Sequence, residues 1–152
     1  MSLSELRSSA QARKGQAGAI DTSRVSQTGA IEAPFGQRIL IVEDELIVAL
    51  DLSDIVEAFG CIPVIVTRVA PAIVLVEEED FDVAILDINI HGEAVYPVAD
   101  ELTRQNIPYI FATGFSIRNV ADGYRQFPIL AKPYSPRHVV AALYGIWRAS
   151  DA

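Results

Sequence analysis

From residue 38 onward, the chain alternates short apolar runs with longer stretches of helical spacing. The five runs are RILIV (38–42), CIPVIV (61–66), VAILD (83–87), YIFAT (109–113) and ILAK (129–132). Each run has the length of a β-strand, and nearly continuous apolar character is typical of strands that are buried on both faces. Because such strands occur in parallel sheets covered by helices, the pattern predicts an α/β fold with a five-stranded parallel sheet.

The stretches between the runs carry apolar residues at the spacing of one helix face. One face comprises Val48, Leu52, Ile55, Val56 and Phe59, a second comprises Val95, Val98, Ala99 and Leu102, and a third, behind a Ser135-Pro136 start, comprises Val139, Val140, Leu143, Ile146 and Trp147. Pro71–Glu77 is a shorter helix candidate, and Ser116–Ala121 is a weaker one that runs into the turn residues DGY. With right-handed crossovers, these elements predict a doubly wound domain with the flavodoxin-like strand order 2-1-3-4-5.

The first 37 residues differ from this pattern. They are rich in Ser, Ala, Gln and Gly, and their apolar residues are isolated. A segment of this composition does not bury enough apolar surface to fold alone. We therefore expect residues 1–37 to be a tail or linker and residues 38–152 to form the domain.

The charge balance narrows the set of partners. The 152 residues carry a net charge of -8, and no cluster of Lys and Arg offsets it. Because such a surface repels phosphates, we expect protein or cation partners, with neither direct DNA binding nor attachment to an anionic membrane. No apolar run approaches the roughly 18 residues of a membrane span, and the N-terminus lacks the apolar core of a signal peptide. A cytoplasmic protein is expected, in which the single cysteine, Cys61, is a buried apolar side chain.

Charged and hydroxyl side chains stand where the predicted strands end. Glu43–Glu45 follow the first run, and Asp87, Thr113 and Lys132 end the third, fourth and fifth. Because ligands of doubly wound folds bind beyond the carboxyl ends of the strands, we expect these side chains to meet at one edge. Carboxylates held close together need a cation, and Mg²⁺ prefers oxygen ligands. Lys132 and Thr113 would then contact a phosphoryl group, and Asp87 would be the nucleophile that forms an acyl phosphate.

Each of these residues also has a plainer interpretation. Asp44 alone could cap the helix that follows it. Asp87 could simply start a loop, Thr113-Gly114 could form a turn, and Lys132 could be a solvated side chain. A site is favoured because all of them occur together at successive strand ends.

The same residues carry a resemblance to a known family. The chain from Arg38 to its end resembles the receiver domain of two-component response regulators, which has a CheY-like fold. The resemblance implies that Asp87 in ILDINIHG is the phosphoacceptor, Thr113 in FATG the switch hydroxyl and Lys132 in AKPY the lysine that contacts the phosphoryl group. The phosphoryl donor would be a sensor histidine kinase or a histidine phosphotransferase.

The resemblance also implies a magnesium site. Asp44 in VEDE would bind Mg²⁺ directly together with Asp87, and Glu43 would bind it mainly through water. Asn89 would contribute its backbone carbonyl. The family's Lys-Pro bond is usually cis, so Lys132-Pro133 is predicted to be cis.

A narrower resemblance rests on three stretches, YIFATGF, DINIHGEAVYPVADEL and KPY. They resemble the FATGUY-type receivers of alphaproteobacteria, which occur as single-domain regulators and as the receiver half of sigma-factor-mimicking stress regulators. Two positions depart from the general family: His91, which we expect to be a solvated loop residue, replaces a proline, and Ile129 replaces the aromatic switch residue. Signalling would then use another route, and our hypothesis is that SIRNVADGYRQF orders upon phosphorylation, with Phe115 or Tyr124 as the aromatic residue.

The resemblance implies a signalling domain that accepts a phosphoryl group on Asp87 in a magnesium-dependent reaction and acts through protein contacts. It would catalyse only its own phosphorylation and dephosphorylation, and related receivers commonly form homodimers. Two other functions stay open, a phosphorylation-independent binding module with a vestigial site and a small aspartyl phosphatase. The phosphatase is disfavoured because its usual DxD pair is missing from the first strand, and a flavodoxin-type cofactor site is disfavoured because VEDE would repel phosphate.

Overall fold

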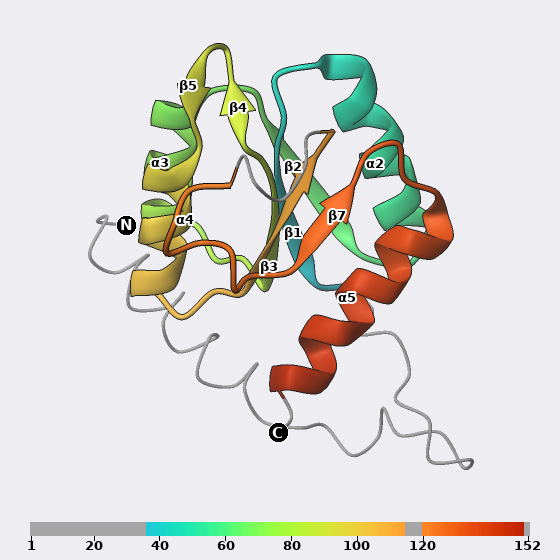
Figure 1. Ribbon diagram of the computed structural model, residues 1–152. Helices are drawn as coiled ribbons and strands as arrows, with labels where there is room; N and C mark the ends of the chain where they lie inside the picture. Colours follow the sequence, from blue (N-terminus) through green and yellow to red (C-terminus); the bar gives the residue numbers. More distant parts are fainter. Residues whose placement is uncertain (1–35, 115–119, 151–152) are drawn as a thin grey trace.

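The computed structural model describes residues 36–114 and 120–150, and strands and helices alternate through this part of the chain (Figure 1). In chain order the elements are β1 (Arg38–Val42), α2 (Leu46–Ala58), β2 (Ile62–Val66), α3 (Val69–Glu78), β3 (Val83–Asp87), β4 (Asn89–Ile90), β5 (Glu93–Ala94), α4 (Tyr96–Arg104), β6 (Tyr109–Thr113), β7 (Ile129–Ala131) and α5 (Pro136–Ser150). All the predicted strands are present, and β1, β3 and β6 have the predicted bounds.

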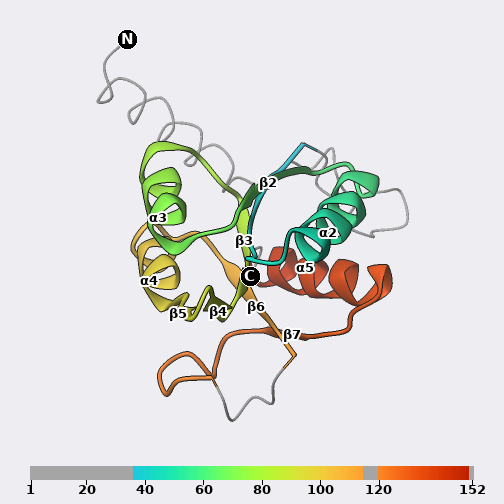
Figure 2. The same cartoon turned by 90° about the horizontal axis from the view of Figure 1, so that it is seen from above.

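Five strands form one parallel sheet in the order β2-β1-β3-β6-β7, which confirms the predicted order 2-1-3-4-5. Helices α3 and α4 cover one face of the sheet, and α2 and α5 cover the other (Figure 2). At the carboxyl edge, Asp87 of β3 pairs with Ala112 of β6, and Thr113 pairs with Ala131 of β7. This edge therefore brings together segments that are far apart in the sequence.

The central strands β1, β3 and β6 are buried on both faces, as their apolar runs predicted, whereas the edge strands β2 and β7 are partly exposed. In β1, Leu40 and Val42 pack on the side of α3 and α4, whereas Ile39 and Ile41 pack on the side of α2 and α5. All four side chains are fully buried. Burying a large aliphatic side chain contributes about 1.5–3 kcal/mol, so the strand that leads into Glu43 is firmly anchored.

Helix α2 is rotated relative to the face that its larger apolar residues predicted. Of the predicted face Val48, Leu52, Ile55, Val56 and Phe59, Leu52 and Val56 are buried and Ile55 and Phe59 pack against the same cluster. The prediction was wrong in part, because Val48 is only half-buried and Ala49 and Ser53 are buried as well. The small side chains of Ala49 and Ser53 let the helix approach the sheet closely. Leu46, Ile47 and Leu50 lie outside this face and are exposed.

The other helices agree more closely with the sequence pattern. The apolar residues predicted for the faces of α4 and α5 are buried, except that Val140 is half-buried. Helix α3 begins at Val69, two residues before the predicted start, and Pro71 is accommodated because proline is tolerated in a first helical turn. Of the weak candidate Ser116–Ala121, residues 116–119 lie outside the described residues, and residues 120–128 form turns.

A short antiparallel hairpin, β4–β5, was not predicted. Asn89 pairs with Ala94 and Ile90 with Glu93, and the turn residues His91-Gly92 have φ angles of 52° and 80°. Positive φ at both central residues is the geometry of a tight two-residue hairpin turn. Two-residue strands are too short to show a period, so no pattern in the sequence could have revealed them.

Three smaller predictions are confirmed. The Lys132–Pro133 peptide bond is cis, and Cys61 is buried. Trp147 of α5 is buried against the sheet, and its indole Nε1 donates a hydrogen bond to Gln37 Oε1 at 2.6 Å. None of the helices in the described residues has the length and apolar character that a membrane span requires.

Candidate functional site

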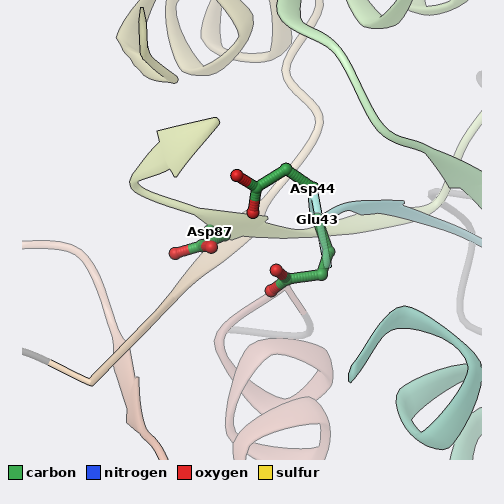
Figure 3. Close-up of side chains that lie close together, drawn as sticks. All are labelled: Glu43, Asp44 and Asp87. Carbon is green, nitrogen blue, oxygen red and sulfur yellow. The ribbon is translucent and has the colours of Figure 1, made fainter. Parts of the chain in front are cut away.

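Three carboxylates gather at the carboxyl edge of the sheet. Glu43 and Asp44 follow β1, and Asp87 ends β3, the neighbouring strand. Figure 3 shows the three side chains around a common space. One carboxylate oxygen from each residue lies within 4.8 Å of those of the other two. The convergence predicted from the strand ends is therefore present for these residues.

Lys132 supplies a positive charge to this cluster. Its Nζ donates a hydrogen bond to Glu43 Oε2 at 2.7 Å and lies 3.4 Å from Asp87 Oδ2. Burial is the largest single effect and would lower the pKa of Lys132, but the hydrogen bonds and negative charges of Glu43 and Asp87 together outweigh burial and raise the pKa. The plainer interpretation of Lys132 as a solvated side chain is wrong, because its side chain is only 20% exposed.

Glu43 is the most deeply buried of the three acids, with its side chain 4% exposed. Its Oε1 accepts a hydrogen bond from the backbone N–H of Glu45 at 3.1 Å, and its other oxygen accepts the bond from Lys132. Burial raises the pKa of Glu43, although the ammonium of Lys132 opposes this effect. These two hydrogen-bond donors therefore stabilise the ionised form of the buried carboxylate.

Asp44 does not cap the helix that follows it. The cap residue of α2 is Glu45, which makes no side-chain capping bond. Instead, Asp44 Oδ2 accepts a hydrogen bond from the backbone N–H of His91 at 2.9 Å. Burial is the largest single effect and would raise the pKa of Asp44, but this bond, together with hydrogen bonds from the Glu43 side chain and from the backbone of Asp44 itself, outweighs burial and lowers the pKa. Sequence reasoning missed this partner because it depends on the unpredicted hairpin.

Asn89 and Thr113 lie beside the acidic cluster. Asn89 begins the hairpin, is exposed, and its Oδ1 accepts a hydrogen bond from the backbone N–H of Gly92 at 2.8 Å. Thr113 ends β6 and is 3% exposed, and its carbonyl accepts the backbone N–H of Lys132 at 2.9 Å. All six predicted site residues therefore lie along one edge of the sheet. His91 lies in the exposed turn, as expected for a loop residue.

The donor set suits a hard divalent cation. The three carboxylates supply oxygen ligands, and the single ammonium of Lys132 leaves them with excess negative charge. Magnesium takes one or two protein carboxylates and completes its shell with water and phosphoryl oxygens. The residues present therefore fit Mg²⁺ at this position.

Comparison with known proteins identifies the family. No established family model matches the chain. The solution structure of SdrG from Sphingomonas melonis Fr1 shares 41% sequence identity with a TM-score of 0.67, over 74% of this chain and 97% of SdrG. This chain belongs to the response regulator receiver family. Receiver structures with lower identity share the fold, such as that of PhyR from Erythrobacter litoralis, at 23% identity and a TM-score of 0.66.

Curated receiver-containing relatives agree. The aerobic respiration control protein ArcA of Escherichia coli K12 is 34% identical over 110 residues, and the phyllosphere-induced regulator PhyR of Methylorubrum extorquens is 31% identical over 119 residues. The matched region covers 66% of this chain in the comparison with ArcA and 74% in the comparison with PhyR. In both comparisons it covers 44% of the relative's length, so this chain spans less than half of either relative. SdrG and PhyR agree with the narrower alphaproteobacterial resemblance.

Proposed function

We propose that this receiver accepts a phosphoryl group on Asp87 from the phosphohistidine of a sensor histidine kinase or histidine phosphotransferase. The observation that carries the proposal is the position of Asp87, with acidic neighbours within 4.8 Å and the Lys132 ammonium at 3.4 Å. A lone carboxylate is a poor acceptor for a phosphoryl group because both carry negative charge. A carboxylate flanked by an ammonium and a cation site is a good one.

The transfer forms one bond and breaks another. An Asp87 carboxylate oxygen attacks phosphorus, and the bond from phosphorus to the histidine nitrogen breaks. The electron pair of that bond stays with the imidazole, which leaves as a neutral ring because its other nitrogen carries a proton or takes one from water. The Lys132 ammonium and the Thr113 hydroxyl donate hydrogen bonds to the phosphoryl oxygens, which offsets the charge that gathers there.

Magnesium is the proposed cofactor. Asp44, Asp87 and the backbone carbonyl of Asn89 would hold it, with Glu43 acting mainly through water, and it would neutralise charge between the acids and the phosphoryl oxygens. The receiver domain of the sensor histidine kinase PA1611 from Pseudomonas aeruginosa PAO1 was solved with magnesium in its active-site cleft, and SdrG was solved in a BeF3-activated conformation. These structures support a similar chemistry here.

The proposed output is a protein contact. In this proposal residues 38–152 act as the receiver, residues 1–37 act as a tail or linker, and the protein works in the cytoplasm without binding DNA directly. Its chemistry is confined to its own phosphorylation and dephosphorylation. The receiver relatives support such a signalling role.

The proposal is tested by exposing the chain to acetyl phosphate with Mg²⁺ and weighing the product by mass spectrometry. We expect the mass of one phosphoryl group to be added, to be absent when EDTA removes the metal, and to be lost on treatment with hydroxylamine, which cleaves acyl phosphates. If the mass does not change with Mg²⁺ present, the site is vestigial and the chain is a binding module.

The exposed apolar residues at the start of α2 are proposed to contact the phosphoryl donor. Leu46, Ile47 and Leu50 are 58%, 78% and 48% exposed, and α2 begins directly beside Glu43 and Asp44. Replacing Ile47 with serine is expected to slow transfer from a phosphorylated sensor kinase about tenfold, because an interface loses a buried aliphatic side chain.

This prediction separates donor contact from chemistry. Phosphorylation of Ile47→Ser by acetyl phosphate should match the unmodified chain, because a small donor needs no helix surface. Val74→Ser is the control: Val74 is 48% exposed on α3, which covers the opposite face of the sheet. Equal slowing by both substitutions would contradict a specific contact at α2.

A further inference from the structure

The turn of the β4–β5 hairpin donates two backbone hydrogen bonds to side chains of the site. The N–H of His91 donates to Asp44 Oδ2 at 2.9 Å, and the N–H of Gly92 donates to Asn89 Oδ1 at 2.8 Å. Asp44 and Asn89 are two of the residues that would hold magnesium in the proposed function. A single turn of the chain therefore contacts both of them.

The bond to Asp44 is possible because His91 replaces the proline that the general family has at this position. A proline has no backbone N–H and its φ angle is fixed near −65°, so it could neither donate this bond nor adopt the φ of 52° that His91 has here. The contact between the hairpin and Asp44 therefore depends on a residue in which this chain departs from the general pattern.

The ladder of the hairpin leaves the backbone carbonyl of Asn89 outside its own hydrogen bonds. Opposite residues in an antiparallel ladder alternate between a hydrogen-bonded pair and a non-hydrogen-bonded pair. The N–H of Val95 donates to the carbonyl of Ile88 at 2.9 Å, which makes these two residues a hydrogen-bonded pair. The next pair, Asn89 with Ala94, is then a non-hydrogen-bonded pair. The carbonyl of Asn89 is therefore directed away from β5 and is left for a metal ion.

The hairpin is anchored in the core next to the acids. Ile90 is 1% exposed and Val95 is fully buried, and both belong to the apolar cluster on the side of the sheet covered by α3 and α4. The two short strands lie at the top of the view in Figure 1, and β4 begins two residues after Asp87. The turn is thus held on one side by the core and on the other by the strand that carries Asp87.

The geometry of the turn depends on Gly92. Its φ angle is 80°, a left-handed conformation that glycine adopts without steric cost but that strains a residue with a Cβ. A Cβ added at Gly92 would meet no atom within 4 Å. The need for glycine therefore arises from the backbone conformation of the turn and not from lack of space around it.

We propose that the β4–β5 hairpin is the positioning element of the magnesium site and that Gly92 is the positioning residue on which its geometry depends. The inference rests on the proposed function and adds the residues that hold the metal ligands in place. The turn fixes the carboxylate of Asp44 and the side chain of Asn89, while the carbonyl of Asn89 stays outside the ladder. Ligands that are held in place before the metal arrives bind it more tightly, because less conformational freedom is lost on binding.

The test is a titration of the full chain with Mg²⁺, without a phosphoryl donor, followed by backbone amide NMR at Asp44 and Asp87. We expect Gly92→Ala to raise the dissociation constant for Mg²⁺ about tenfold, an effect typical of losing a group that orients a metal ligand. Gly123→Ala is the matched control. Gly123 has a φ angle of 93° in the turn segment between β6 and β7, and a Cβ there also meets no atom within 4 Å. This control should bind Mg²⁺ as the unmodified chain does.

A second variant guards against a folding defect in Gly92→Ala. Asn89→Ala removes the acceptor of the Gly92 N–H but keeps the backbone carbonyl of residue 89, and it introduces no strain into the turn. The dissociation constant for Mg²⁺ should rise in this variant too, because the turn loses one of its two contacts with the site.

An unchanged dissociation constant in Gly92→Ala would overturn the inference, and so would an equal rise in Gly92→Ala and Gly123→Ala. If the unmodified chain does not bind Mg²⁺, the inference falls together with the proposed cofactor. Phosphorylation by acetyl phosphate is the second readout, in which Gly92→Ala should need about tenfold more Mg²⁺ for its half-maximal rate. If Mg²⁺ binds as expected but no chain is phosphorylated, the positioning role stands and the proposed acceptor chemistry fails.

Discussion

Replacing Asp87 with asparagine is expected to lower the rate of phosphoryl incorporation by at least about a thousandfold. An amide is a far weaker nucleophile than a carboxylate and cannot form an acyl phosphate. The substitution keeps the shape of the side chain at the end of β3, where Asp87 pairs with Ala112. It also removes one of the two negative charges that face Lys132, so the remaining bond from Lys132 to Glu43 should persist.

The measurement is the initial rate of hydroxylamine-sensitive mass gain from acetyl phosphate with Mg²⁺. Asp54→Asn is the matched control, because it makes the same chemical change at an exposed position of α2. The control should be phosphorylated at the unmodified rate. Persistent incorporation into Asp87→Asn would show that Glu43 or Asp44, the two other carboxylates of the cluster, is the acceptor.

The sheet was predictable because its signals are local. The runs that became β1, β3 and β6 have the predicted bounds, since strands buried on both faces must be apolar at nearly every position. The order of the strands followed from the handedness of the crossovers. Once the order was known, the placement of Asp87, Thr113 and Lys132 on one edge followed, because parallel strands share their carboxyl ends.

The structural features that the sequence did not reveal depend on contacts between residues that are far apart in the chain. The buried face of α2 includes Ala49 and Ser53. These small residues favour burial only where a helix packs closely on a sheet, and that contact cannot be seen in the sequence. The bond from His91 to Asp44 joins residues 47 positions apart. It also requires a hairpin too short to have a period. The hydrogen bond from the Tyr124 hydroxyl to Asp100 likewise joins residues 24 positions apart, and neither residue is unusual in its local sequence.

Removing the ammonium of Lys132 is expected to destabilise the fold as well as the chemistry. In Lys132→Met, Glu43 loses the hydrogen bond at 2.7 Å and remains with its side chain 4% exposed. Breaking a fully buried ion pair costs about 3–5 kcal/mol. We expect a loss of about 2 kcal/mol in the free energy of unfolding, since the Lys132 side chain is 20% exposed and Glu43 can take up a proton. Urea unfolding in EDTA measures the difference.

The pH dependence of that loss identifies its cause. Burial raises the pKa of Glu43 above its usual value of 4.5, so the folded state holds the proton more tightly than the unfolded chain does. The stability that protonated Glu43 contributes is therefore lost as the pH rises through its raised pKa. The ammonium of Lys132 offsets this loss. The deficit of Lys132→Met should grow with rising pH and shrink in acid.

A double variant completes the argument. Adding Glu43→Gln to Lys132→Met removes the buried charge that lost its partner, so most of the stability should return. The acceptor chemistry should not return, because no ammonium is left to face the phosphoryl group on Asp87. If the double variant is as unstable as Lys132→Met, the cost lies in the packing of the lysine's methylene chain rather than in its charge. The ion pair between Glu43, which follows β1, and Lys132, which follows β7, would then serve the chemistry of the site without stabilising the fold.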